Sequence, residues 1–208
     1  MPKICIIDYE LGNVMSLQNA LNKINIENKI SRELEIINNS DFLILPGVGS
    51  FEKGMSQLKK FNLIEILNKE VLLKKKKILG ICLGFHLMCK SSSEFDNSIQ
   101  GLGWLNLSVE KLMAQNLRLP HTGWNTLSFI DNQSKTMKKI RNNDFLYFNH
   151  SYCIKKNTDR NFKILSKTLY GNEFISSGTR DNIYGIQPHP EKSQDVGLKF
   201  LKNLFLNL

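Results

Sequence analysis

The sequence has few cysteines, no long apolar run and no recognisable export signal, and each shortage excludes a class of protein. No apolar stretch approaches the roughly 20 residues needed to span a bilayer, which argues against a membrane protein. Residues 1–8 carry one lysine before a short apolar run, so they lack both the basic region and the length of a signal peptide. We therefore expect a soluble, cytoplasmic protein.

The four cysteines are scattered along the chain, at Cys5, Cys82, Cys89 and Cys153. They form no CxxC pair, and no histidine stands at zinc-ligand spacing from them, so we expect neither a metal site nor a cofactor. Free thiols are the default in a chain without a secretory signal. A cysteine in an unusual local setting is then a candidate nucleophile, and the others are expected to be small buried hydrophobic residues.

The net charge of +9 raises the question of an anionic partner. The densest basic cluster, residues 74–77, lies between an apolar helical stretch and an apolar strand, where a charge run is usually a solvated helix end. The sequence has no arginine-rich stripe or basic stretch interleaved with aromatics, so we expect no nucleic-acid binding.

Chain length and apolar periodicity predict one α/β domain spanning residues 1–208, since 208 residues with 41% hydrophobic content suffice for one core. Short apolar runs alternate with helical patterns in the first half, which predicts a mainly parallel sheet covered on both faces. The expected strands are 3–8, 27–31, 41–45 and 78–82, and the expected helices follow Asn13, cover 51–74 with a break near Asn62, and begin again at Leu83.

The second half of the chain favours extended segments separated by turn residues. These segments are 105–112, 126–130, 145–148, 162–169, 174–179 and 183–187. We expect them to add antiparallel strands to the edge of the sheet. A last helix over 196–206 has an apolar stripe and should cover one face.

The central chemical feature is Gly80-Ile81-Cys82-Leu83-Gly84, a cysteine between an apolar strand and a helix with a glycine two positions away on each side. A sharp strand-to-helix turn holds a nucleophile in a strained conformation and needs small flanking residues. Such a turn places Cys82 at a helix N-terminus, where the thiolate is favoured, and offers the Leu83 amide as an oxyanion donor. A buried cysteine in an ordinary tight turn is the alternative interpretation.

A second feature is the segment 187–191, in which His189 lies between two prolines and Glu191 follows two residues later. The prolines restrict the backbone of the histidine, and the carboxylate can bond the distal imidazole nitrogen and stabilise the imidazolium. Cys82 and His189 are thus a candidate nucleophile and general base. Taken alone, His189 would be interpreted as a surface histidine in a turn, and the cysteine turn at Cys82 is what favours a catalytic role.

A third feature, residues 45–49 (LPGVG), ends an apolar strand with two glycines. Backbone of this kind can approach a ligand closely, and ligands bind at the carboxyl edge of open α/β sheets. It is not a phosphate-binding P-loop, because no Gly-Lys-Ser/Thr follows.

These three features, in this order, resemble the class I glutamine amidotransferases. Further strings resemble the glutaminase subunits of imidazole glycerol phosphate synthase and extend the likeness over nearly the whole chain. They are Ile7-Asp8-Tyr9 with Gly12-Asn13 and Ser16, PGVGSF at 46–51, HTGWN at 121–125, FNHSY at 148–152 and HPEKS at 189–193.

The resemblance implies a three-layer α/β sandwich that hydrolyses L-glutamine to glutamate and ammonia. The ammonia would pass through an internal channel to a separate (β/α)₈-barrel synthase/cyclase subunit, with which the chain would form a heterodimer. By the family pattern the nucleophile is Cys82, the general acid and base is His189, and its orienting group is Glu191. The pattern further implies an oxyanion hole from the amides of Leu83 and Val48, glutamine contacts from Gly49, Ser151 and Tyr152, and a partner interface at Asn13 and Trp124.

The sequence departs from the family pattern at two positions near the nucleophile. The usual glutamine four residues after the cysteine is His86, and the usual acidic position a few residues later is Lys90, although Glu94 remains available for the substrate ammonium. Imidazole and amide differ in donor count and charge beside a zwitterionic ligand. We expect glutamine binding that is weaker or differently arranged, and not abolished.

Three alternatives remain open at this stage. The ammonia could serve histidine biosynthesis, or a paralogous pair of subunits that aminates a surface-polysaccharide sugar, which the altered His86 and Lys90 make credible. A different cysteine-elbow hydrolase would not need Glu191 or the GWN and HSY strings. A non-catalytic binding partner of the same fold would be favoured by loss of Cys82, His189 or Glu191, all of which are present.

Overall fold

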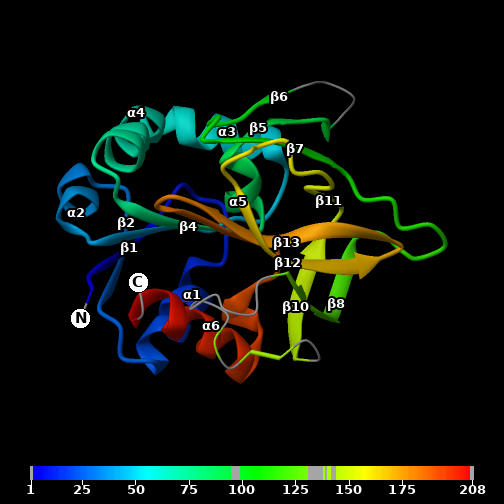
Figure 1. The fold of residues 1–208 in the computed structure, drawn as a ribbon. Coiled ribbons are helices and arrows are strands. Elements are labelled where there is room, and N and C mark those ends of the chain that lie inside the picture. The colour runs from blue at the N-terminus through cyan, green and yellow to red at the C-terminus, as the bar shows by residue number, and fades with distance from the viewer. Residues whose placement is uncertain (1, 95–98, 131–137, 139, 142–143, 207–208) are drawn as a thin grey trace.

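The structure is a computed structural model that describes residues 2–94, 99–130, 138, 140–141 and 144–206. Its centre is an eight-stranded sheet with helices on both faces (Figure 1). In spatial order the strands are β2 (Asn28–Ser31), β1 (Ile4–Ile7), β3 (Phe42–Leu45), β4 (Lys77–Ile81), β14 (Ile183–Ile186), β13 (Asn172–Arg180), β12 (Lys163–Tyr170) and β9 (Ser128–Phe129). The first five strands run parallel to one another, and each of the last three runs antiparallel to the strand before it. The sheet is therefore mixed and mainly parallel.

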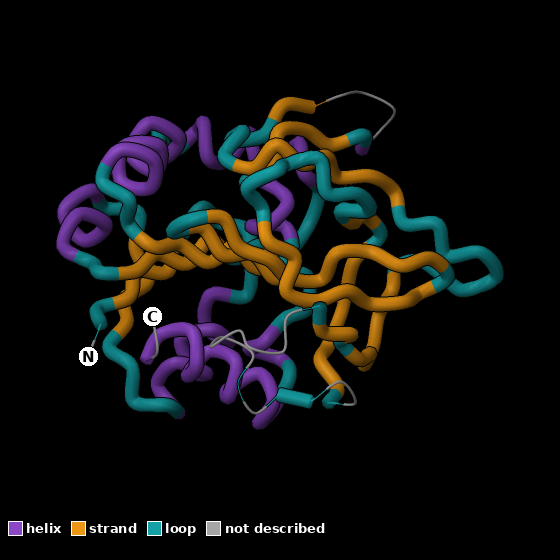
Figure 2. The backbone as a smooth tube through the Cα atoms, in the orientation of Figure 1, coloured by secondary structure: helices purple, strands orange, loops and turns teal. Residues whose placement is uncertain are grey.

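Helices form a layer on each face of this sheet (Figures 1 and 2). One face carries α1 (Val14–Lys23) and α6 (Gln194–Leu206), and the other carries α2 (Leu34–Asn39), α3 (Phe51–Lys60), α4 (Leu63–Asn68), the π-helical η1 (Lys69–Leu73) and α5 (Leu83–Leu87). Because successive strand residues point to opposite faces, Ile4 and Ile6 of β1 belong to the core under α1 and α6, while Cys5 and Ile7 belong to the core under the other helices. This is the three-layer α/β arrangement expected from the sequence.

Two smaller sheets accompany the main one. A four-stranded sheet contains, in order, β11 (Tyr152–Cys153), β7 (Leu105–Lys111), β5 (Cys89–Ser92) and β6 (Ile99–Gln100). A two-stranded sheet pairs β8 (His121–Thr126) with β10 (Phe145–His150). The first packs into the core beside α3 and α5, and the second contributes Leu146 and Phe148 to the core on the α1 and α6 side.

The expectation that every strand of the second half extends the sheet edge as an antiparallel strand is wrong in three places. Segment 105–112 is β7 of the four-stranded sheet, and segment 145–148 is part of β10 of the two-stranded sheet. Segment 183–187 is β14, which lies inside the main sheet and runs parallel to β4. Alternation of apolar residues reports which face of a strand is buried, and it carries no information on which strand is its neighbour.

The helices follow the expectation more closely. The break predicted near Asn62 is present, because α3 ends at Lys60 and Asn62 adopts a left-handed φ of 54° before α4. The final helix begins two residues earlier than expected, at Gln194. Of the helices in the described part of the chain, none has the length and apolar character needed to cross a membrane.

Candidate active site

The candidate site forms where three neighbouring parallel strands end. Strands β3, β4 and β14 lie side by side, with Leu45 opposite Gly80 and Ile186 opposite Ile81. The chain continues from these strand ends into the glycine-rich segment 46–49, into Cys82 and into Gln187. Parallel strands present their carboxyl ends at the same edge of a sheet. The topology therefore brings together three sequence features that extend from residue 46 to residue 187 of the chain.

Cys82 occupies the sharp strand-to-helix turn that the sequence predicts. Its backbone has φ 51° and ψ −109°, a positive φ that is costly for a residue with a side chain. The turn is held on both sides, since the Cys82 amide donates to the Ile186 carbonyl at 2.8 Å and the Cys82 carbonyl accepts from the His86 amide at 3.1 Å. The nucleophile candidate thus has a fixed position at the N-terminus of α5.

The two glycines around this turn are required by packing. A Cβ at Gly84 would lie 1.7 Å from the Leu45 carbonyl oxygen, and one at Gly80 would lie 2.7 Å from the Phe85 backbone. Both distances are below 3.0 Å, which real Cβ atoms essentially never show. The G-x-C-x-G pattern therefore reflects how closely β3, β4 and α5 approach one another at the turn.

Cys82 differs from the other three cysteines in its surroundings. All four are free thiols, and Cys5, Cys89 and Cys153 are fully buried in the apolar cores. Burial raises the pKa of each of these three thiols, so they stay neutral near pH 7. Cys82 instead lines a cavity and contacts polar groups, which makes it the candidate for chemistry.

His189 and Glu191 form a buried pair next to Cys82. The Nδ1 atom of His189 lies 2.8 Å from the Glu191 carboxylate, and the two side chains are only 2% and 5% exposed. The backbone of His189 is anchored to β10, because its amide donates to the Tyr147 carbonyl at 2.8 Å. Glu191 lies in the short 3₁₀ helix η4 (Pro190–Lys192) that follows.

The electrostatics of this pair favour a protonated imidazole. Burial alone lowers the pKa of His189, but the negative charge of the Cys82 sulfur and the Glu191 carboxylate outweigh it and raise that pKa to about 10. The Nε2 atom of His189 makes no hydrogen bond of normal geometry to any described residue, although it is close enough to Cys82 for this electrostatic interaction. Catalytic hydrogen bonds are commonly loose without substrate.

A cavity opens over Cys82 and collects most of the predicted site residues. Val48, Gly49, Leu83, His86, Glu94, Ser151 and Tyr152 all line it together with Cys82. Five further lining residues received no role from the sequence: Phe51, Ser92, Val109, Asn149 and His150. Asn149 and His150 belong to the FNHSY string, so the sequence resemblance could have indicated them as site residues. Val109 lies on β7, and the sequence does not reveal how that strand pairs.

Tyr9 contacts the segment 46–49 and restrains it at Pro46. The Tyr9 hydroxyl donates to the Pro46 carbonyl at 2.5 Å, and a Cβ on Gly47 would collide with that hydroxyl. Gly49 has a φ of +117° with open space around it. The Leu83 amide stands at the first position of α5, where no intrahelical acceptor is available. Backbone donors thus border the cavity near the Cys82 sulfur.

His86 and Glu94 have hydrogen-bond partners in the protein. The His86 Nε2 atom lies 2.6 Å from Oε1 of Gln187, and burial lowers the pKa of His86 to about 4, so this imidazole is neutral near pH 7. Glu94 accepts from the Phe51 amide at 2.5 Å, and burial raises its pKa. Lys90, the other departure from the family pattern, is exposed and does not line the cavity.

The segment that carries Ser151 and Tyr152, between β10 and β11, is tied to a pair of buried histidines. The Nδ1 atom of His150 donates to the Tyr152 carbonyl at 2.8 Å, so its Nε2 atom accepts from Nδ1 of His121 at 3.1 Å. The ring of His121 stacks on Tyr170 with centroids 3.9 Å apart. Burial lowers the pKa of both histidines, which keeps this chain of hydrogen bonds uncharged.

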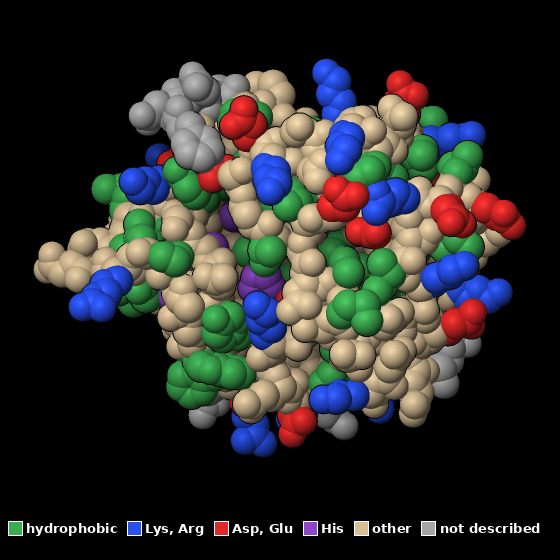
Figure 3. Space-filling model, turned by 180° about the vertical axis from the view of Figure 1, so that it is seen from behind, with side chains coloured by type: hydrophobic (Ala, Val, Ile, Leu, Met, Phe, Trp, Pro, Cys, Tyr) green, Lys and Arg blue, Asp and Glu red, His purple; other side chains and the backbone are tan. Residues whose placement is uncertain are grey.

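The two predicted interface residues lie outside the cavity. Asn13 caps α1 by accepting from the Ser16 amide at 3.2 Å. Trp124 lies on β8, is 47% exposed and packs edge-on against Tyr147. Seen from behind, the surface carries apolar side chains among scattered basic and acidic ones, and lysine and arginine do not gather into one patch on this face (Figure 3).

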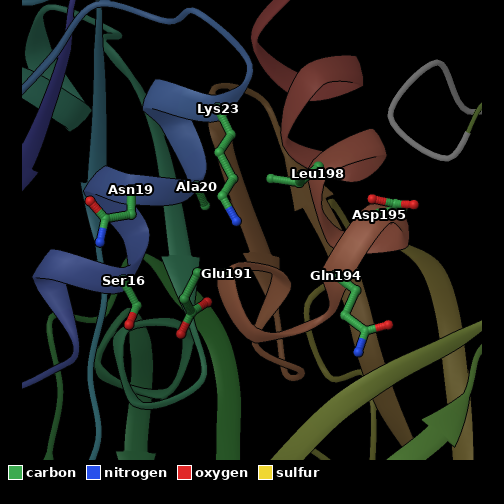
Figure 4. Close-up of a pocket in the computed structure, with 8 residues that line it drawn as sticks. All are labelled: Ser16, Asn19, Ala20, Lys23, Glu191, Gln194, Asp195 and Leu198. Atoms are coloured by element: carbon green, nitrogen blue, oxygen red, sulfur yellow. The ribbon is translucent and has the colours of Figure 1, made fainter.

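Glu191 also lines a separate pocket between α1 and α6 (Figure 4). Its other lining residues are mostly polar: Ser16, Asn19, Ala20, Lys23, Gln194, Asp195 and Leu198. Cys82 does not line it, so this pocket is distinct from the cavity over the nucleophile. Within the described residues, no group of three or more His, Cys, Asp or Glu is arranged to hold a metal ion.

The chain is similar to known proteins in sequence and in fold. The profile of the family described as "Glutamine amidotransferase class-I" matches residues 5–208. A Methanococcus maripaludis protein named imidazole glycerol phosphate synthase subunit HisH 2 is 45% identical, over 96% of this chain and 97% of the relative. The subunit HisH 1 of Campylobacter jejuni is 40% identical, over 96% and 98%. A solved structure described as PurLQS from Thermotoga maritima shares the fold, with a TM-score of 0.75 at 17% identity over 99% of this chain and 98% of that one.

Proposed function

Because the chain belongs to the class-I glutamine amidotransferase family, we propose that it is the glutaminase subunit of an imidazole glycerol phosphate synthase in histidine biosynthesis. It hydrolyses L-glutamine to glutamate and ammonia. The names of relatives that are 37–45% identical over nearly the full length support this assignment. The observation that carries it is the strained Cys82 turn beside a cavity and the buried His189–Glu191 pair.

The proposed reaction begins with attack of the Cys82 sulfur on the side-chain amide carbon of glutamine. In this proposal the attacking form of Cys82 is the thiolate. The raised pKa of His189 keeps its imidazole protonated near pH 7, so His189 can give a proton to the departing nitrogen, which leaves as ammonia. A γ-glutamyl thioester remains. Water then attacks the thioester, His189 takes a proton from it, and glutamate leaves as the sulfur regains its charge. Glu191 orients the imidazole throughout.

The tetrahedral intermediates of both steps carry a negative oxygen that needs backbone donors. We assign this oxyanion hole to the amides of Leu83 and Val48, which border the cavity. The glycines on either side of Val48 allow its peptide to turn, and Tyr9 restrains the segment at Pro46. We assign glutamine binding to Gly49, Ser151 and Tyr152, with His86 and Glu94 at the same cavity.

The partner in this proposal is a (β/α)₈-barrel synthase/cyclase subunit that receives the ammonia and forms a heterodimer with this single-domain chain in the cytoplasm. On this chain, the surface that contacts the barrel includes Asn13 and Trp124. The exposed Trp124 supports this assignment, because aromatic residues that are left open to solvent are common anchors of interfaces. The chain alone is expected to hydrolyse glutamine slowly, since docking is required to complete the arrangement of segment 46–49.

A complementation experiment tests the function. A histidine auxotroph that lacks its own glutaminase subunit receives this chain together with its barrel partner, and growth without histidine is expected. Cys82→Ala should abolish growth, whereas the matched control Cys5→Ala, at a buried cysteine that does not line the cavity, should not. Glutaminase activity of the purified pair without growth on histidine-free medium would favour the alternative, amination of a surface-polysaccharide sugar.

A second assay addresses the unusual histidine in the cavity. We predict that His86→Gln, which restores the amide of the family pattern, lowers the KM for glutamine in the complex with the barrel. Steady-state glutaminase kinetics of the two complexes measure this. An unchanged KM or a lower activity would show that His86 does not weaken glutamine binding.

A further inference from the structure

Gln187 connects His86 to the nucleophile. Its side-chain Nε2 atom donates to the Cys82 sulfur at 3.6 Å, and its Oε1 atom lies 2.6 Å from Nε2 of His86. All three side chains are buried, with exposed fractions of 0% for Gln187 and 5% for each of the other two. Neither Gln187 nor its contact with His86 belongs to the Cys82–His189–Glu191 set.

We propose that Gln187 is a further catalytic residue, which stabilises the Cys82 thiolate by donating a hydrogen bond to the sulfur, and that His86 positions it. The glutaminase role of Cys82 is the proposed function above, and the consequence for glutamine hydrolysis rests on it. The hydrogen bond itself is a property of the folded chain.

The direction of the hydrogen bonds follows from the chemistry of the two ends of an amide. The His86 imidazole is neutral, so it carries one N–H, and at Nε2 that N–H donates to the Gln187 oxygen. This leaves the amide nitrogen of Gln187 facing the sulfur with a donor. If His86 offered no donor, the amide could rotate and place its oxygen lone pairs against a negative sulfur, which is unfavourable.

The contact distinguishes the two protonation states of Cys82. A neutral thiol can donate to the Asn149 carbonyl, which lies 3.9 Å from the sulfur. A thiolate has no proton to donate and needs donors instead, and the Gln187 amide supplies one at 3.6 Å. Hydrogen bonds to the charged form of a group favour that form.

Backbone anchors fix the relative positions of these residues. Gln187 follows the last residue of β14, and its amide donates to the Ser176 carbonyl of β13 at 2.8 Å. His86 lies one helical turn after Cys82, and its amide donates to the Cys82 carbonyl. The three side chains are therefore held by β14 and α5, which also hold the strained turn.

A pH titration of the thiolate in the full chain tests the proposal. The ultraviolet absorbance of the thiolate is measured as the difference between each variant and the same variant carrying Cys82→Ser. The other titratable groups around Cys82 remain in place: Tyr9, His150, His189 and Glu191. For Gln187→Leu we expect the midpoint to rise by about one pH unit, the effect of losing a hydrogen bond to a charged group.

Three further variants separate this role from a structural one. His86→Leu should shift the midpoint in the same direction, and the double variant should shift it no further than Gln187→Leu alone, because His86 acts through Gln187. His86→Gln should keep the parent midpoint, since its Nε2 donor lies the same number of bonds from the backbone. Thr168→Val is the matched control and should leave the midpoint unchanged, because it removes a hydrogen bond to the Thr126 carbonyl and Thr168 does not line the cavity.

The outcomes are independent of whether the chain acts on glutamine, because neither glutamine nor the partner is present. An unchanged midpoint in Gln187→Leu, or fully additive shifts in the double variant, would overturn the proposal. If Gln187→Leu does not fold, as judged by circular dichroism, Gln187→Glu keeps the shape of the side chain and places a carboxylate beside the sulfur. That variant should raise the midpoint further, and an unchanged or lower midpoint would equally refute the role of Gln187.

Discussion

Substitution of Gly84 by alanine should damage both the fold and the chemistry, and the structure sets the scale. The new Cβ would lie 1.7 Å from the Leu45 carbonyl oxygen, whereas real Cβ contacts do not fall below 3.0 Å. The gap between α5 and the end of β3 must therefore open by more than 1 Å. Because both sides of the contact are backbone, no change of side-chain rotamer relieves it.

The expected loss of stability is about 3 kcal/mol, the upper end for overpacking, which lowers the Tm by about 6–12 °C in a chain of this size. The same movement displaces the Cys82 turn relative to segment 46–49, and a shift of about 1 Å in a reacting geometry costs about 100-fold in rate. Calorimetry and the glutaminase kcat/KM of the complex with the barrel measure the two effects.

Gly103→Ala is the control for this prediction. Gly103 has a φ of +69° but no atom within 4 Å of the position of its Cβ, so alanine there incurs only backbone strain of about 1–2 kcal/mol. Its Tm should fall less than that of Gly84→Ala, and its kcat/KM should match the parent. A Gly84→Ala variant with the parent's Tm and kcat/KM would refute the account of the turn.

Three other predictions concern buried and exposed groups around the site. Burial lowers the pKa of His86 to about 4 and of His150 to about 3, so both are neutral in the folded protein and take up protons on unfolding. The free energy of unfolding is therefore at its full value above about pH 6.5 and falls as the pH drops towards these pKa values. Urea unfolding should show a loss of about 2 kcal/mol per histidine between about pH 7.5 and 5. An equally stable protein at both pH values would contradict this. Tyr9→Phe removes the donor to the Pro46 carbonyl, which should reduce glutaminase kcat more than it changes KM and cost about 1–2 kcal/mol of stability; a KM effect alone would count against it. Trp124→Ala, at a 47% exposed position, should change the free energy of unfolding by no more than about 0.5 kcal/mol. It should weaken binding to the barrel at least about tenfold in calorimetric titration. Parent-like affinity would exclude Trp124 from the interface.

Much of the site follows from sequence because its parts sit at strand ends. The segments that end at Leu45, Ile81 and Ile186 are short apolar runs, and Pro46, Cys82 and Gln187 follow them directly. The strands and the residues at their carboxyl ends are therefore visible in the sequence. Parallel neighbours bring Val48 and Cys82 to one edge. Gln187 joins them because β14 runs parallel to β4, which the sequence did not predict.

What the sequence does not reveal depends on pairing and on contacts between distant side chains. The strand β7 looks like any edge strand by its alternation, and its place beside β5 is decided by packing against α3 and α5. The helix α2 has six residues, too few to show a helical period. The link between His86 and Gln187 joins positions 101 residues apart, and only the fold brings them to 2.6 Å.

The cluster of lysines at residues 74–77 shows the same limit. A charge run at a helix end reads as solvated, yet Lys76 is largely buried and bonds the buried Glu70 carboxylate at 2.8 Å. It also donates to the Ile37 carbonyl at 2.6 Å, which ties α2 to the end of η1. This lysine cluster is therefore partly an internal ion-pair network around Glu70 and is not a free basic patch.

Trapping of the nucleophile tests the central claim most directly. The chain is incubated with its barrel partner and a glutamine analogue that carries an electrophilic carbon, and each cysteine-containing peptide is weighed by mass spectrometry. The account predicts one adduct, on Cys82, with none on the buried Cys5, Cys89 or Cys153. An unlabelled Cys82 in the presence of the partner, or labelling of another cysteine in its place, would contradict it.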